Sequence, residues 1–290
     1  MQKSFIPTTM KVRILSVLAI LILLAGLTLF FEKRDPLFHQ RDLHHEFVLL
    51  QGHHSYGFDL VDPVQAPASI RKSVIRGYQI LTDTHSYAPQ YASSQLSCTH
   101  CHFSEGDTIG GKNNGFSLVG VPTAYPRFSS RDGKIITLAQ RINNCFERSL
   151  NGKPLPVDSQ EMNDILAYLE WISKEVSHLK NLPWLGITPL KSTHEPDSIK
   201  GKQIYQSTCT ACHGADGAGG GKLPPPVGKT IPPIWGKDSF NEAAGMSKLA
   251  TMAAFIYWNM PYQQASLTEN QAWDVAAFVL EQPHPPNQRK

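Results

Sequence analysis

The chain has 290 residues and a formal net charge of +3, with 21 glycines, 21 prolines and five cysteines. This length leaves room for two small domains, and so weak a charge gives no argument for binding to nucleic acid. The sequence contains no Walker phosphate loop, no GxGxxG motif after a strand and no HExxH zinc motif, and its glycines and prolines predict long loops around modest helices.

The N-terminal segment, residues 1–31, is predicted to be a membrane anchor. Lys11 and Arg13 precede an uncharged apolar run at 14–31, and Glu32 follows it at once. The 18 residues of this run exceed the apolar part of an ordinary signal peptide and approach the ~20 needed to span a bilayer. We therefore expect an uncleaved helix in the inner membrane and a periplasmic location for the rest of the chain. The alternative is a long signal peptide, cleaved to leave a soluble periplasmic protein.

The remainder divides into a spacer, two similar copies of one motif order, and the segments between and after them. Polar residues at 32–65 are expected to form a periplasmic spacer. The copies lie at 66–180 and 199–284, a proline-punctuated linker at 181–198 joins them, and a tail at 285–290 follows. In each copy a candidate helix precedes a Cys-x-x-Cys-His motif, and loops then lead to a closing amphipathic helix.

The two Cys-x-x-Cys-His motifs are CTHCH at 98–102 and CTACH at 209–213. This pattern is the attachment motif of c-type haem, in which two thiols bond to the vinyl groups and the histidine becomes the proximal iron ligand. A zinc site would need a second pair of ligands nearby, and a thioredoxin-like redox pair would need a βαβ pattern. We therefore predict two covalently bound haem c groups, held by Cys98, Cys101, His102 and by Cys209, Cys212, His213.

The helices of both copies follow the order of a cytochrome c domain. ASIRKSVIRGYQILTDT and SIKGKQIYQS precede the two motifs, and the closing helices have Asp158 and Thr268 as candidate N-caps. Each closing helix carries an apolar face at helical spacing. The predicted fold class is mainly α, with two tandem cytochrome c domains preceded by the transmembrane helix.

Each proximal histidine leaves one axial position of its iron to be filled. In the second copy the candidate is Met260, 47 residues after His213 and directly before a proline. Met246 and Met252 are rivals that are also consistent with packing. The first copy has no methionine in the equivalent window, where Cys145 lies 43 residues after His102. The repeat therefore indicates Cys145 as the distal ligand of the first haem.

The local pattern around Cys145 supports that interpretation. A helix capped by Thr137 is predicted to run through Ser149, with its apolar stripe at Ile142, Phe146 and Leu150. The neighbouring stripe holds Arg141, Cys145 and Ser149, whereas a structural cysteine more often lies on the apolar stripe. Because a thiolate donates electron density, it should lower the potential of the first haem and favour an active site there.

Two arginines near Cys145 are candidates for holding an anionic substrate. Arg141 lies one helical turn before the cysteine, and Arg131 lies upstream in SSRDGK. Guanidinium groups suit oxyanions because they donate two parallel hydrogen bonds. The alternatives for each arginine alone are a solvated surface charge and a partner for a haem propionate. Their nearness to Cys145 favours a shared substrate pocket.

These residues resemble the dihaem thiosulfate dehydrogenase family. The matching stretches cover most of residues 70–283 and include IRGYQILTDT, LSCTHCH, CTACHGADGAG, PPIWGKDSFNEAAGM and AAFIYWNMP. The most specific is RINNCFERSLNG, which cytochrome c domains at large do not carry. The resemblance implies oxidation of two thiosulfates to tetrathionate, reversed in some members, with electrons leaving through the second haem. We expect the acceptor to be a periplasmic cytochrome or a quinone-linked membrane enzyme.

The resemblance also implies a role for each matching residue. Cys145 would be the axial thiolate opposite His102, and Arg131, Arg141 and Ser149 would line the pocket for the sulfur oxyanion. His213 and Met260 would hold the second haem. Some relatives have a lysine before this methionine, where this chain has Asn259, which favours methionine ligation.

Three other functions remain open from the sequence alone. A dihaem electron carrier explains the repeat but gives no role to Cys145. A cytochrome subunit of a sulfur-oxidising complex would also use a cysteine-ligated haem, and it would need a partner for activity. A dihaem peroxidase would want an open or histidine-ligated catalytic haem, which the cysteine argues against.

Overall fold

The computed structural model describes residues 62–108, 110, 112–113, 115–179, 182–223 and 229–287, and the backbone of 46–51 and 54–59. The predicted membrane anchor at 1–31 lies outside these residues. Within the part of the chain that is described, no helix has the length and apolar character needed to cross a membrane. The described residues are mainly helical, as predicted.

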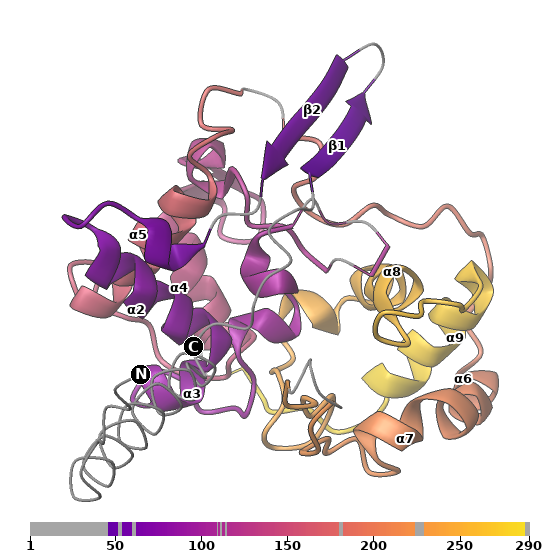
Figure 1. Cartoon of the computed structure of the whole chain (residues 1–290). Helices are drawn as coiled ribbons and strands as arrows, with labels where there is room; N and C mark the ends of the chain where they lie inside the picture. Colours follow the sequence, from indigo (N-terminus) through magenta and orange to yellow (C-terminus); the bar gives the residue numbers. More distant parts are fainter. Residues whose placement is uncertain are drawn as a thin grey trace, which may run out of the picture. The chain divides into compact units, whose positions relative to one another are not determined.

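The end of the spacer forms an antiparallel hairpin. Its strands are β1 (Glu46–Gln51) and β2 (His54–Asp59), paired from Glu46 with Asp59 to Gln51 with His54. Figure 1 shows the two strands side by side. The polar composition of residues 32–65 indicates only a spacer, so these strands were not predicted.

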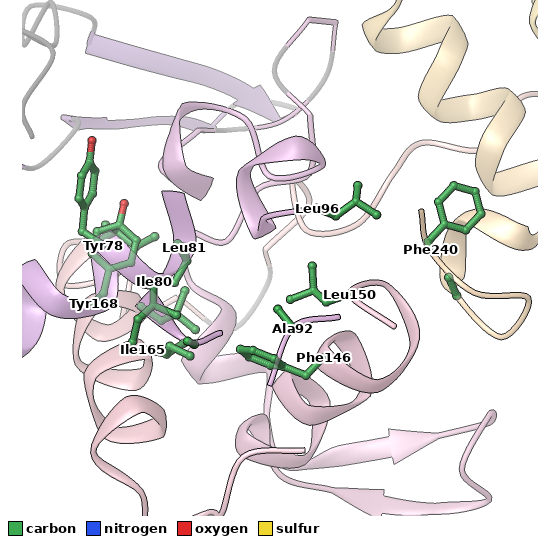
Figure 2. Packing of buried hydrophobic residues seen from close by; sticks show 14 of the residues in the cluster. Tyr78, Ile80, Leu81, Ala92, Leu96, Phe146, Leu150, Ile165, Tyr168 and Phe240 are labelled. Atoms are coloured by element: carbon green, nitrogen blue, oxygen red, sulfur yellow. The ribbon is translucent and has the colours of Figure 1, made fainter. Parts of the chain in front are cut away.

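The first copy is built on two helices that pack against each other (Figure 1), α2 (Arg71–Thr82) and α5 (Gln160–Ile172). Gly77 permits the crossing, because a Cβ at this position would collide with the backbone carbonyl of Asp164. Figure 2 shows the apolar side chains that fill this core, among them Tyr78, Ile80, Leu81, Ile165 and Tyr168. Packing of this kind buries the apolar face that the sequence placed on each helix.

Shorter elements complete the first copy. They are α3 (Thr84–Tyr87), the hairpin β3 (Arg127–Ser129) and β4 (Lys134–Ile136), and α4 (Leu138–Arg148). Single 3-10 turns lie at Pro63–Gln65, Cys98–His100, Ser104–Gly106 and Val121–Ala124. The haem-attachment motif of this copy begins in the second of these turns.

The second copy repeats the same arrangement. Its first helix α6 (Ser198–Ile204) continues through a π-helical turn at Tyr205–Cys209 into α7 (Thr210–His213). A 3-10 turn at Gly245–Ser247 precedes α8 (Leu249–Asn259), and α9 (Glu269–Leu280) closes the domain against α6 and α8. Gly201 meets the carbonyl of Asp274 where the helices cross, as Gly77 meets Asp164 in the first copy. The internal repeat therefore extends to the helix contact itself.

Two of the predicted helix caps are confirmed and one is wrong. Thr268 caps α9 and Thr137 caps α4, each in a reciprocal capping box with the glutamine three residues later. The prediction of Asp158 was wrong, because Ser159 caps α5 by accepting a hydrogen bond from the Met162 backbone. The helix begins one residue later than expected, which leaves Asp158 outside the cap.

Candidate active site

A cavity of about 310 Å³ opens beside the first haem-attachment motif. Cys98, Cys101 and His102 line one part of it, and Arg141 and Cys145 from α4 and Ser149, its C-cap, line another. The sequence placed these last three residues on one helical stripe. Apart from them the walls are largely apolar, with Leu81, Leu96, Phe116, Leu138, Ile165 and Leu169 among the lining side chains.

The chemistry of the donor residues fits a covalently attached haem. Burial raises the pKa of Cys98 to about 11 and that of Cys101 to about 12, so both are neutral thiols before a haem is attached. Burial lowers the pKa of His102 to about 4, which keeps its imidazole neutral. His102 Nδ1 lies 2.9 Å from the carbonyl oxygen of Phe116, and a proton on Nδ1 that donates to this oxygen leaves the Nε2 lone pair available to iron.

Helix α4 presents Cys145 to the cavity because its other face is buried. Phe146 and Leu150 are almost fully buried in the core (Figure 2). Asn143 fixes the helix further, since its side chain exchanges two hydrogen bonds with the backbone of Leu155, at 2.9 Å and 2.8 Å. The packing therefore determines which stripe of α4 faces the haem site.

Arg141 and Cys145 form a direct pair on this stripe. The Arg141 Nη1 donates a hydrogen bond to the Cys145 Sγ at 2.8 Å. The negative charge of Cys145 raises the pKa of Arg141, burial opposes this, and Tyr125 adds to it. A guanidinium so placed stabilises a thiolate and also attracts an anion that approaches it.

Arg131 lies near this site but does not line the cavity. Its Nη2 donates to the carbonyl oxygen of Ala243 in the second copy. Burial lowers the pKa of Arg131 first, and the nearby charges of Arg148 and Arg141 lower it further. Among the described residues, those that line the cavity include Arg141 but not Arg131.

The turn that contains Arg131 is held in place by the carboxylate of Asp132. Asp132 accepts hydrogen bonds from Ser129 at 2.6 Å, from Arg148 at 2.8 Å and from Asn144 at 2.9 Å. These three bonds lower the pKa of Asp132 to about 2, the bond from Ser129 most strongly. Asp132 thereby clamps the turn between β3 and β4 onto helix α4.

Two cavity residues were missed by the sequence analysis, Tyr125 and Arg127. Both line the first cavity, and the Arg127 guanidinium lies over the Tyr125 ring at 5.5 Å from its centroid. They precede and begin the hairpin β3–β4, and no helical spacing relates them to Cys145. Only the folded chain around the hairpin shows that these two side chains reach the cavity.

A second cavity of about 160 Å³ contains the second haem-attachment motif. Cys209, Cys212, His213 and Met260 line it, as the prediction of axial ligands requires. His213 Nδ1 lies 3.2 Å from the carbonyl oxygen of Pro232, the same arrangement as for His102. Burial lowers the pKa of His213 and raises that of Cys209 to about 11.

The two cavities share part of their walls. Leu96, Cys101, Phe240 and Met246 line both of them. Met246 and Met252, the rivals of Met260, also line the second cavity, so proximity alone does not separate the three methionines. The two sites are therefore neighbours that share these four side chains.

Comparison with known proteins agrees with this arrangement. Residues 84–177 match the family "SoxA/TsdA, cytochrome c domain", and residues 198–283 match the family "Cytochrome c". The prediction of two tandem cytochrome c domains with two covalently bound haem c groups is thus confirmed.

Several known proteins resemble most of the chain. A thiosulfate dehydrogenase of Allochromatium vinosum is 42% identical over 218 residues, which are 75% of this chain and 80% of that protein. A thiosulfate dehydrogenase of Psychrobacter arcticus is 37% identical, over 73% of this chain and 64% of that protein. The solved thiosulfate dehydrogenase TsdBA of Marichromatium purpuratum, in its as-isolated form, has a TM-score of 0.70 and 25% identity, over 80% of this chain and 50% of that chain.

Proposed function

The chain belongs to the thiosulfate dehydrogenase family, and on that premise we propose that it joins two thiosulfates into tetrathionate, 2 S2O3(2−) → S4O6(2−) + 2 e−. The observation that carries the proposal is the Arg141–Cys145 pair, at 2.8 Å, on the wall of a cavity that also contains His102. A pure electron carrier has no use for this pair. We also propose that the reaction can run in reverse, as tetrathionate reduction.

The chain supplies a complete set of residues for two haems. Cys98, Cys101, His102 and Cys145 would hold the first haem, and Cys209, Cys212, His213 and Met260 would hold the second. When bound, each haem exchanges one electron at a time, and a thiolate ligand gives a lower potential than methionine does. Two such centres suit a reaction that releases two electrons.

The Cys145 sulfur carries the proposed bond-making steps. First its thiolate bonds to the terminal sulfur of one thiosulfate as two electrons leave: Cys–S(−) + S2O3(2−) → Cys–S–S–SO3(−) + 2 e−. A second thiosulfate then attacks the sulfur next to the sulfonate, and the bond to Cys145 breaks. Tetrathionate leaves and the thiolate returns, as in thiol–disulfide exchange.

Arg141 serves both steps by its charge and its position. It stabilises the Cys145 thiolate, which is both the attacking group and the later leaving group, and its remaining N–H groups suit a sulfonate. Ser149 lines the cavity one turn beyond the cysteine and offers a hydroxyl donor. Arg131 would contribute positive charge close to Arg141 and Cys145 while its guanidinium donates to the Ala243 carbonyl.

Electrons are proposed to leave through the second domain. The walls shared by the two cavities support this route, since Phe240 and Met246 lie between the sites. The acceptor would be a periplasmic cytochrome or a quinone-linked membrane enzyme. The export segment that the sequence predicts at 1–31 supports the proposal of a periplasmic, membrane-anchored protein, and c-type haem attachment outside the cytoplasm in bacteria agrees with it.

Turnover by the isolated chain tests the proposal. Thiosulfate should drive the reduction of ferricyanide and yield tetrathionate with the purified protein, after two haems per chain have been verified. Tetrathionate with a reduced dye as electron donor tests the reverse direction in the same preparation. If a chain with both haems gave no turnover in either direction, the proposal would be replaced by an electron carrier or by a subunit of a larger complex.

A further inference from the structure

Asn259 belongs to the second domain and contacts the first, and both the oxygen and the nitrogen of its side-chain amide form hydrogen bonds. It is the last residue of α8 and its side chain is fully buried. Its Oδ1 accepts the backbone N–H of Gly115, from the first domain, at 2.7 Å. Its Nδ2 donates to the carbonyl of Phe255, within its own helix, at 3.1 Å. Since Met260 follows directly, the residue proposed to bind the second haem adjoins a bond to the first domain.

The segment held by Asn259 also supports His102. The Phe116 carbonyl lies 2.9 Å from His102 Nδ1, and the Phe116 N–H donates to the Cys101 carbonyl at 2.9 Å. Gly115 lets the segment approach this closely, because its φ is +63° and a Cβ would lie 2.6 Å from the Cys101 oxygen. Asn259 therefore reaches the support of the proximal histidine through one residue of backbone.

A second link runs in the opposite direction, from the first domain to the support of His213. The Ser97 N–H donates to His100 Nδ1 at 2.8 Å, so His100 Nε2 carries the proton and donates to the Thr230 carbonyl at 3.0 Å. Two residues later, the Pro232 carbonyl lies 3.2 Å from His213 Nδ1. Each domain thus holds the peptide segment that supports the proximal histidine of the other.

We propose that Asn259 and His100 are positioning residues that tie the proximal histidine of each haem to the opposite domain, so that the two reduction potentials are set jointly. The physical reason is that an Nδ1–H bond to a fixed carbonyl makes an imidazole a stronger donor, which favours oxidised iron. Loosening that carbonyl should raise the potential of the haem concerned. The inference rests on the haem ligands of the proposed function and not on the substrate.

Redox titration of the protein with both haems tests the first link. Asn259→Ala removes the bond to Gly115 and should raise the potential of the first haem, with the reduction equilibrium changing about tenfold, or 59 mV for one electron. The first haem is identified as the one whose spectrum changes in Cys145→Ala.

The matched control is Asn113→Gly. It removes another side-chain hydrogen bond between the two domains, the one that the Ala265 N–H donates to Asn113 Oδ1 at 2.9 Å. Glycine adopts the φ of +65° found at this position without strain. Because the bonds of Gly115 to Asn259 and of Phe116 to His102 and Cys101 remain in this variant, it should leave the potential of the first haem unchanged.

The second link gives an independent test. His100→Ala should raise the potential of the second haem by loosening Thr230 and Pro232. The proposal would be overturned by unchanged potentials in both Asn259→Ala and His100→Ala. Equal shifts in Asn259→Ala and Asn113→Gly would also overturn it. If only one of Asn259→Ala and His100→Ala keeps both haems, the potentials of that variant decide. The titration uses no thiosulfate. Unchanged potentials would therefore not affect the conclusion from the turnover assay, and absence of turnover would not affect the interpretation of the potentials.

Discussion

The Arg141 guanidinium donates a hydrogen bond to the Cys145 sulfur at 2.8 Å, across one turn of a helix whose opposite face is packed into the core. Cation and thiol are therefore fixed relative to each other before any substrate arrives. The relation is the most direct result of the sequence pattern, because residues four apart on a helix lie on one face. The same pair determines how substitutions at the cavity should change the kinetics of thiosulfate oxidation.

Arg141→Lys should weaken catalysis although the charge is kept. An ammonium cannot bond the thiolate and a sulfonate in the same planar geometry, so we expect kcat/KM for thiosulfate to fall about 10- to 100-fold. Arg76→Lys is the control, since Arg76 lies over the Tyr87 ring at 4.9 Å and not in the cavity. Steady-state kinetics with thiosulfate measure both variants, and equal activity of the two would contradict the role given to Arg141.

Arg127→Gln should affect binding more than the chemical step. Arg127 lines the cavity beside Tyr125 and has no hydrogen bond to Cys145 among those observed, so its charge should act by attracting both thiosulfates. We expect KM to rise by about 3- to 10-fold with kcat nearly unchanged, and the difference should shrink at high salt. Lys134→Gln, on the other strand of the hairpin, serves as the control. A fall in kcat with constant KM would show that this account of Arg127 is wrong.

Asp132→Asn should destabilise the protein at neutral pH but not in strong acid. The pKa of Asp132 falls from 3.8 to about 2 on folding, so its carboxylate stabilises the folded chain above pH 4. This contribution disappears as the pH falls through about 2, where the native carboxyl is protonated as well. Urea unfolding at pH 7 should show a loss of about 1–2 kcal/mol, because three hydrogen bonds are weakened. The same loss at pH 2 would contradict this explanation.

Gly201→Ala tests the repeated helix crossing. A Cβ at this position would meet the Asp274 carbonyl, so α6 and α9 must move apart. We expect a loss of about 2–4 kcal/mol in the free energy of unfolding, measured by chemical denaturation. Gly245→Ala is the matched control, since a Cβ there meets no described atom within 4 Å. Similar stability of both variants would mean that α6 and α9 do not cross closely at Gly201.

The sequence predicted those features that depend on local spacing. The caps Thr137 and Thr268, the two stripes of α4 and the haem-attachment motifs follow from neighbours along one helix or turn. The Ser159 cap was missed by one residue, because Asp and Ser are both good caps and stand side by side.

Features that depend on contacts between distant segments could not be predicted. Arg131 turns to Ala243 because a loop of the second domain lies against the hairpin β3–β4. Tyr125 and Arg127 reach the cavity only through the path of the loop before that hairpin. In the sequence Asn259 stands out only as the residue before Met260, whereas its buried hydrogen bond to Gly115 joins positions 144 residues apart.

The most direct test of the central claim is mass spectrometry of the protein after exposure to thiosulfate and an electron acceptor. If Cys145 performs the chemistry, a peptide containing it should gain one –S–SO3(−) group, which a reductant removes. Cys145→Gly, verified to carry two haems, should show neither the adduct nor turnover. Tetrathionate formation at the parental rate by Cys145→Gly, or turnover without any adduct on Cys145, would contradict the account.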